Sequence, residues 1–402
     1  MLLSALALPI LIALQTPVEQ DAPTTTSPTS PTSTTPPITP SPWTLWGSVE
    51  GYGQWNFNTP QNGVTNFRAF DNRHASLTLK NAMLGVTFDV DNVVGALTGQ
   101  VGATGATYYA AEPALAGAAG ANASSAALWQ FVQQAHLGYR LPIHHGVLVQ
   151  GGLFLSPIGP ESIPAKDNWF ASNSTLFFGL PFYHTGARAT VVDAFAGVVD
   201  GVDVTAAVYN GWNSVVDNNL GKSVSAQLLW TVKDTVVVSL LYFGGIERDD
   251  DAPEGPAWRH LVDSHVTWTA TPWLSLQWHG DIGGEVGTFG PGGWAATAMA
   301  VRVQPLPFLS LAARGDVLAE RVARNDEGTA SAIFFPADRV GAATLTLELR
   351  PAPTLSVRTE LRHDQASAPM YFRDDVAVDR SGAFVPDADG QTTITLAAIA
   401  WF

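Results

Sequence analysis

The last stretch of the chain, residues 390–402, has a simple alternating pattern of side chains. Its sequence is GQTTITLAAIAWF, and apolar residues occupy every second position back from Phe402. A period of two residues indicates a β-strand. A strand this apolar fits poorly at the solvent-exposed edge of a sheet. It is typical of the closing strand of a transmembrane β-barrel, with Phe402 in the interfacial aromatic girdle. The last strand of a soluble sandwich is the alternative for this stretch alone.

Similar alternating segments recur from Trp43 onward, with turn residues between them. This pattern predicts an all-β fold of about sixteen strands. The strands are expected near residues 43–57, 73–89, 93–105, 127–141, 146–156, 182–193, 201–213, 222–232, 235–247, 258–269, 273–285, 294–304, 308–320, 339–350, 354–364 and 391–402.

The connections between these segments differ in length. Every second connection is short, as at residues 89–92, 233–234 and 305–307, whereas those between are long and polar, as at residues 58–72 and 365–390. Short periplasmic turns and long extracellular loops are the pattern of bacterial outer-membrane barrels. An even number of strands places both ends of the barrel on the periplasmic side. We therefore predict one antiparallel transmembrane barrel over residues 43–402.

The two faces of the predicted wall are clearest at residues 354–364. One set of positions is apolar, and the other contains Arg358, Glu360 and Arg362. A charged side chain facing lipid costs about 2–4 kcal/mol at the midplane, so these charges should face the lumen. About sixteen strands leave an aqueous channel, so the lumen should be wet. The predicted pore-lining residues are Arg302, Arg314, Asp316, Glu348, Arg350, Arg358, Glu360, Arg362, His279, Asp281, His184 and Arg188, and Asp263, His265, Glu285 and Glu320 share this face.

The second strand breaks its own alternation. Leu77 and Leu79 share one set of positions, but Leu84, Val86 and Phe88 share the other. A β-bulge adds one residue to a strand and would reconcile the two sets. We predict a bulge near Asn81.

The amino terminus has a different composition. Residues 1–20 resemble a secretory signal peptide with an apolar segment at 2–14, although no Lys or Arg precedes that segment. Residues 21–42 are almost wholly Thr, Ser and Pro, which predicts a disordered linker. The chain has no Cys, so a lipoprotein anchor is excluded. Export followed by insertion into the outer membrane of a Gram-negative bacterium is the expected localisation.

Three segments resemble a known family. They are DNWFASNSTLFFGLPFYHTGAR at residues 167–188, YNGWNSVVDNNLGK at 209–222 and GYGQWNF at 51–57. These stretches are similar to the OmpL-like β-barrel porins, over most of residues 49–232 and weakly beyond. The resemblance implies an outer-membrane porin and supplies no substrate. This sequence departs from a typical member in its Thr/Ser/Pro segment and in the missing basic residues near its start. Neither departure changes the assignment of the barrel.

The third long loop, residues 157–181, is the candidate constriction. It is rich in Asn, Ser and aromatic residues, and it either folds into the lumen or caps the outer rim. Its candidate residues are Asp167, Asn168, Trp169, Phe177 and Phe178. In one hypothesis Arg314, Arg358 and Arg362 face Asp167 across the narrowest point. In the alternative these arginines only pair with Glu360 and Asp316, away from that point.

His184 and Arg188 open the strand after this loop, and two roles remain open for them. They either line the pore or anchor the strand by satisfying loop carbonyl groups.

Enzyme, cofactor and metal signatures are missing from the sequence. Neither G-x-S-x-G nor H-E-x-x-H occurs, and we predict no enzymatic activity, no cofactor and no metal. Residues 217–219 and 249–251 carry oxygen ligands but lack the spacing of a calcium loop. His279 and Asp281 are interpreted as ordinary pore lining. The excess of 35 acidic over 20 basic residues argues against binding to nucleic acid.

The predicted function is therefore passive diffusion of small hydrophilic solutes or ions through a charge-lined lumen. The alternatives are a barrel-borne enzyme and a plugged structural or adhesive barrel. Expected partners are outer-membrane lipid and lipopolysaccharide, and the barrel-assembly machinery through the strand ending in Phe402. A homotrimer is a candidate assembly, because sixteen-stranded porins are commonly trimers.

Overall fold

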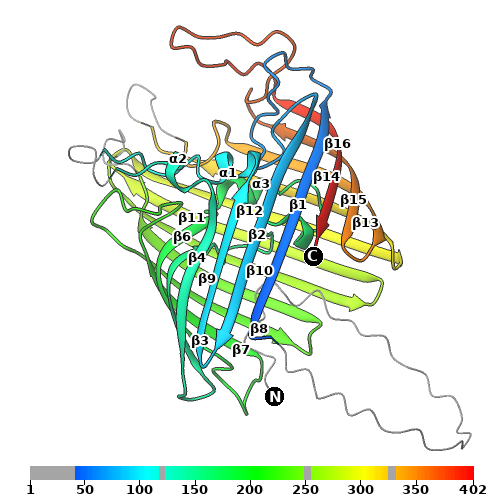
Figure 1. Cartoon of the computed structure of the whole chain (residues 1–402). Helices are drawn as coiled ribbons and strands as arrows, with labels where there is room; N and C mark the ends of the chain where they lie inside the picture. Colours follow the sequence, from blue (N-terminus) through cyan, green and yellow to red (C-terminus); the bar gives the residue numbers. More distant parts are fainter. Residues whose placement is uncertain (1–40, 117–122, 249–254, 325–331) are drawn as a thin grey trace, which may run out of the picture.

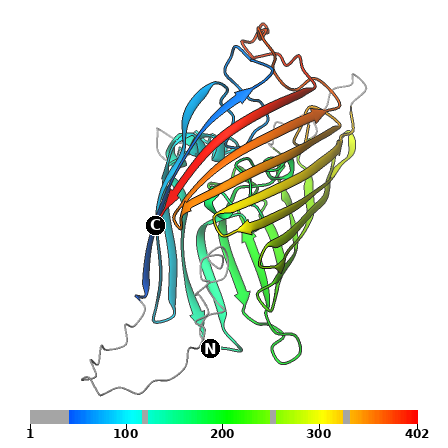
Figure 2. The same ribbon diagram turned by 90° about the vertical axis from the view of Figure 1, so that its right-hand side faces the viewer.

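The polypeptide forms one closed β-barrel. The computed structural model describes residues 41–116, 123–248, 255–324 and 332–402. Each strand pairs antiparallel with its neighbours in sequence, and β16 pairs with β1 to close the ring (Figure 1, Figure 2). This arrangement confirms the predicted fold. Within the described ranges, no helix has the length and apolar character needed to span a membrane.

The elements follow each other in the order of the chain. The first eight strands are β1 (Trp43–Asn56), β2 (Ser76–Val90), β3 (Val93–Val101), β4 (Val132–Leu141), β5 (Val147–Leu155), β6 (Tyr183–Val191), β7 (Val202–Tyr209) and β8 (Ser223–Val232). The second eight are β9 (Val236–Ile246), β10 (Trp258–Thr271), β11 (Leu274–Gly287), β12 (Gly290–Leu306), β13 (Leu309–Arg321), β14 (Arg339–Ala352), β15 (Leu355–Ala366) and β16 (Gly390–Trp401). The short helices are α1 (Ala103–Tyr108), α2 (Ala126–Trp129), η2 (Ala165–Asp167) and α3 (Thr175–Gly179).

Some predicted boundaries are wrong at the end that carries the long loops. The third strand ends at Val101 because α1 follows at Ala103, and the fourth begins only at Val132, after α2. The seventh strand ends at Tyr209 instead of continuing to residue 213. The alternation of loop lengths is also less strict than expected. The β6–β7 connection at the short-turn end spans residues 192–201, whereas only residues 288–289 join β11 to β12 at the opposite end.

The carboxyl-terminal strand closes the barrel as predicted. In the register between β1 and β16, Ser48 lies opposite Trp401. The Phe402 N–H donates a hydrogen bond of 3.1 Å to the Gly47 carbonyl oxygen. The Phe402 ring lies on the outside of the wall with 70% of its surface exposed. A Cβ atom on Gly47 would lie 2.6 Å from this ring, so the absence of a side chain at Gly47 permits the contact.

The predicted bulge lies in β2. Glu50 pairs with Asn81 and Gly51 pairs with Leu79, so Lys80 is the additional residue. Lys80 and Asn81 are both buried, whereas Leu77, Leu79 and Leu84 are all exposed. The extra residue therefore keeps every leucine of this strand on the lipid side.

Candidate functional site

The segment between β5 and β6, residues 156–182, lies inside the barrel. Its Thr175 N–H donates to Asp316 on β13 at 2.9 Å, and its Ala165 N–H donates to Glu50 on β1 at 2.8 Å. In a ring of sixteen strands, β5 and β13 lie on opposite walls (13 − 5 = 8). A loop that leaves β5 and contacts β13 must cross the lumen. Of the two arrangements left open by the sequence, the structure has the lumenal one, and we call these residues the lumenal loop.

Arg358 on β15 anchors this loop to the wall. Its guanidinium donates to the carbonyl oxygens of Ala165 and Phe170, at 2.8 and 3.0 Å, and it pairs with Glu348 at 3.0 Å. The residue is 0% exposed. A buried charge is stable only when it is paired and hydrogen-bonded; Arg358 is paired with Glu348, and all three of its side-chain nitrogens donate hydrogen bonds. It fixes the loop backbone instead of facing open water.

The neighbouring arginines bind the same stretch of loop. Arg362 pairs with Asp364 at 2.8 Å and also donates to the carbonyl oxygen of Asn173. Arg314 donates to the Ser172 carbonyl oxygen at 3.1 Å and pairs with Asp316 at the same distance. All three predicted constriction arginines are therefore buried against the lumenal loop.

Acidic residues of the wall bind the N–H groups of the loop. Glu360 accepts from the Ala171 and Ser172 N–H groups, at 2.7 and 3.1 Å. Arginines thus bind loop carbonyl groups while Glu360 and Asp316 bind loop N–H groups. Such charge-assisted hydrogen bonds are about twice as strong as neutral ones.

Asp167 forms its ion pair with a neighbouring lysine, and the Arg358 guanidinium acts on it electrostatically without forming an ion pair with it. Its carboxylate pairs with the adjacent Lys166 at 2.7 Å. Burial raises the pKa of the Asp167 carboxyl, and the Lys166 ammonium offsets part of that rise. The Arg358 guanidinium instead reaches the Ala165 carbonyl at the start of the same short helix, η2.

The other four predicted loop residues shape and pack the loop. Asn168 donates to the Ser162 carbonyl oxygen and accepts from the Ser162 N–H, at 2.7 and 2.8 Å. Trp169 packs beside Phe170, Ala300 and Ala312. The Phe177 ring lies 5.1 Å from that of Phe182, and the Phe178 ring lies 5.5 Å from that of Phe335.

Three predicted lining residues keep exposed surface. The Arg302 and Arg350 side chains are 15% and 28% exposed, and Arg188 is also partly exposed. Arg302 and Arg350 lie 3.6 and 3.3 Å from the Glu348 carboxylate, which also pairs with Arg358. Three positive charges therefore surround one negative charge.

His184, His279 and Asp281 face the interior but are buried. His184 has one ring nitrogen 3.0 Å from the Gly211 carbonyl oxygen and stacks on Tyr209. This is the geometry of the strand-anchor alternative. Arg188 hydrogen-bonds to Gln150 at 2.9 Å and lies over the Phe154 ring.

The sequence of this barrel matches one family over almost its whole described length. Residues 42–402 match the family model described as "Putative beta-barrel porin-2, OmpL-like". The chain belongs to this porin family. It is an outer-membrane β-barrel channel, as the resemblance of its three sequence segments indicated.

Solved structures similar to this porin are outer-membrane proteins. The trimer form of OmpT from Vibrio cholerae has 10% identity and a TM-score of 0.55, covering 90% of this chain and 99% of that one. The channel DcaP of Acinetobacter baumannii has 12% identity and a TM-score of 0.53, covering 90% and 97%. An anion-selective porin from Comamonas acidovorans has 10% identity and a TM-score of 0.55, covering 90% and 99%. At these identities the likeness concerns the fold. No curated protein matches the sequence significantly.

Sequence reasoning missed several charged residues in this porin's interior. Arg68, in the connection between β1 and β2, pairs with Asp364 on β15 at 2.8 Å. Glu161 pairs with Arg314 at 3.1 Å, and Lys80 donates to the Ala171 carbonyl oxygen. Glu112 accepts hydrogen bonds from Tyr183 and Val215, and burial raises its pKa. Loop residues have no periodicity that assigns them to a face. Lys80 was missed because it is the bulge residue, where the alternation of faces is interrupted.

The sequence has two oxygen-rich segments, residues 217–219 and 249–251, that lack the spacing of a calcium loop. Asp217 pairs with Lys222 and also accepts from the Asn219 N–H, and its side chain is only 11% exposed. Residues 249–251, like residues 1–40, lie outside the described residues.

Proposed function

We propose that this porin passes small hydrophilic solutes and ions by passive diffusion, and that the lumenal loop forms the constriction. The observation that supports this proposal is the attachment of residues 165–175 to β1, β13 and β15. A loop held on several sides narrows the lumen at a fixed position. The narrowed region lies inside a wall that is sealed against lipid.

We further propose a preference for anions. The Glu348 carboxylate is surrounded by Arg302, Arg350 and Arg358. Arg302 and Arg350 keep exposed surface on the short-turn side of the lumenal loop. The uncompensated charge is positive (3 − 1 = 2). A positive field at a narrow passage attracts anions and repels cations.

Single-channel recording of the purified protein in a planar bilayer tests both proposals. We expect discrete conductance steps, and in a KCl gradient a reversal potential displaced toward the chloride equilibrium potential. Conductance steps with a reversal potential near the potassium equilibrium potential would contradict the proposed anion selectivity but not the channel proposal. An absence of steps from folded, membrane-inserted protein would contradict the channel proposal.

A plugged barrel is the second candidate, because the lumenal loop buries much of the charged wall. Arg358, Glu360 and Arg362 are each at most 2% exposed. If the wild-type protein is silent and a variant that releases the loop conducts, the loop is a plug. If both conduct, it is a constriction.

The remaining expectations about partners are also proposals. We propose that residues 1–20 direct export, that residues 21–42 form a linker, and that Phe402 contributes to recognition by the assembly machinery. The exposed apolar outer wall suits contact with lipid and lipopolysaccharide. A homotrimer is proposed by analogy with the trimer form of OmpT and is tested by cross-linking. Family and fold are those of a non-enzymatic channel.

A further inference from the structure

Two adjacent strands bring together four side chains that can bind a metal. Asp263 and His265 belong to β10, and His279 and Asp281 belong to β11. In the antiparallel register, Asp263 lies opposite Asp281 and His265 lies opposite His279. Strand residues two apart share a face, so all four side chains point into the barrel.

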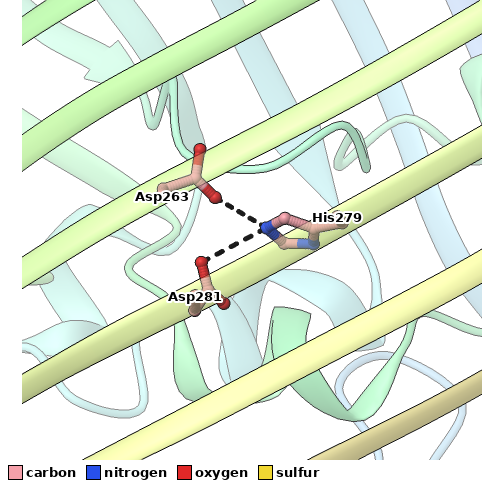
Figure 3. Close-up of side chains that lie close together, drawn as sticks. All are labelled: Asp263, His279 and Asp281. Atoms are coloured by element: carbon pink, nitrogen blue, oxygen red, sulfur yellow. Dashed lines mark hydrogen bonds and ion pairs between the residues drawn. The ribbon is translucent and has the colours of Figure 1, made fainter.

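The possible ligand atoms of three of these side chains, those of Asp263, His279 and Asp281, converge. His279 Nε2 lies 2.6 Å from Asp263 Oδ2 and 3.4 Å from Asp281 Oδ1, as Figure 3 shows. His265 Nδ1 lies 3.7 Å from Asp263 Oδ1. One donor atom each from Asp263, His279 and Asp281 fits within a span of 4.8 Å.

Two side-chain atoms of this cluster that could bind a metal have no hydrogen-bond partner. Asp281 Oδ1 and His265 Nδ1 are both buried, on side chains that are 2% and 9% exposed. A buried polar atom without a partner costs about 1–3 kcal/mol. Its presence at a native site calls for an explanation, such as a bound ion.

The charges of the cluster also favour a cation. Asp263 and Asp281 are directly opposite each other, and like charges in this position destabilise a sheet. Among the residues that the structure describes, neither carboxylate forms an ion pair with Arg or Lys; their paired groups are histidines.

We propose that Asp263, His279 and Asp281 bind one divalent transition-metal ion, with Zn²⁺ as the best match, and that His265 supports Asp263 from outside the ligand set. Imidazole nitrogen and carboxylate oxygen are Zn²⁺ ligands, and three such ligands with a water molecule suit a tetrahedral site. With bonds of about 2.0–2.1 Å, neighbouring ligand atoms are about 3.3 Å apart. The distance of 3.4 Å between His279 Nε2 and Asp281 Oδ1 already fits. The distance of 2.6 Å between His279 Nε2 and Asp263 Oδ2 increases when the ion replaces the proton that these two atoms share. This proposal revises the sequence-based expectation of no metal.

The site lies where the lumenal loop begins. The Gly159 N–H points to Asp263 Oδ1 at 3.4 Å. Gly159 has a positive φ of 77°, and a Cβ there would lie 2.9 Å from His279 Cε1. The loop backbone therefore rests on the imidazole. Beyond His265, toward the short-turn end, Thr267 and Gln277 are partly exposed, and this periplasmic side is the proposed entry for the ion.

Zn²⁺ binding by the tag-free, full-length barrel in detergent tests the proposal. The protein is stripped with EDTA and dialysed, and Zn²⁺ is then titrated by calorimetry, with metal content measured by mass spectrometry. We expect one equivalent per chain. D281N and H265Q should each weaken binding at least about tenfold, because losing even an outer-shell partner costs 10–100-fold. Co²⁺ should give the visible spectrum of a four-coordinate site.

The control is H136Q, which removes a histidine on the inner face of β4 that is hydrogen-bonded to Gln150 and remote in sequence from the cluster. It should bind Zn²⁺ like the wild type. Heat-modifiable gel mobility identifies folded protein. If D281N does not fold, H265Q decides the outcome. The proposal is overturned if the wild type shows no saturable Zn²⁺ binding, if the cluster variants bind as the wild type does, or if Ca²⁺ binds more tightly than Zn²⁺.

Discussion

Arg358 and Glu348 lie directly opposite each other on β15 and β14, with their charged groups 3.0 Å apart. The same guanidinium holds two carbonyl oxygens of the lumenal loop. One cross-strand pair therefore connects the wall of the barrel to the segment that narrows it. Its removal should affect both stability and conductance.

The first prediction is that R358S releases the loop. Breaking a buried ion pair costs about 3–5 kcal/mol, because the remaining buried groups lose their partner. The loop carbonyls of Ala165 and Phe170 also lose their donor. We expect a lower unfolding temperature and larger, noisier single-channel currents. The control is R339S, at an exposed position of β14. Wild-type conductance and stability in R358S would show that Arg358 does not hold the loop.

The second prediction concerns ion selectivity. The double variant R302S/R350S should shift the reversal potential in a salt gradient toward cations, because it removes both partly exposed positive charges beside Glu348. The matched control is R321S, an exposed arginine at the end of β13. An unchanged reversal potential with normal conductance would place these arginines away from the ion path.

The third prediction concerns closure of the barrel. F402D should block assembly in the outer membrane, because it places a charge where an aromatic ring packs on Gly47 at the lipid interface. F402Y keeps the ring and should assemble. The measurement is the amount of heat-modifiable barrel in the outer-membrane fraction. Normal amounts of folded F402D would contradict this interpretation of the last strand.

The fourth prediction is a pH dependence from Asp167. Burial raises the pKa of this carboxyl above its ordinary value of 3.8 in the folded protein. The folded state therefore holds the proton more tightly than the unfolded state does, and stability falls as pH rises from about 4 through the raised pKa. D167N has no titrating carboxyl at this position, so this contribution to the pH dependence of stability is absent. Unfolding temperatures should thus fall more steeply with pH in the wild type than in D167N. Parallel pH profiles would show that Asp167 titrates alike in both states.

The strands and their two faces could be predicted from the sequence alone. Side chains in a strand alternate with a period of two, and lipid excludes charge from one of the two sets. The sequence therefore predicted the charged face of β15, the closing strand β16 and the bulge at Lys80. The boundaries at α1 and α2 were not, because short helical turns next to a strand carry no distinct period.

The partners of the charged residues were decided only by the tertiary structure. Loops have no periodicity, so nothing local indicated that residues 156–182 enter the lumen or that Arg68 reaches Asp364. Likewise, the sequence placed Asp263, His265, His279 and Asp281 on one face, but only the register between β10 and β11 sets them opposite each other. A shift of one residue in pairing would have separated these four groups, because register fixes which side chains meet across a sheet.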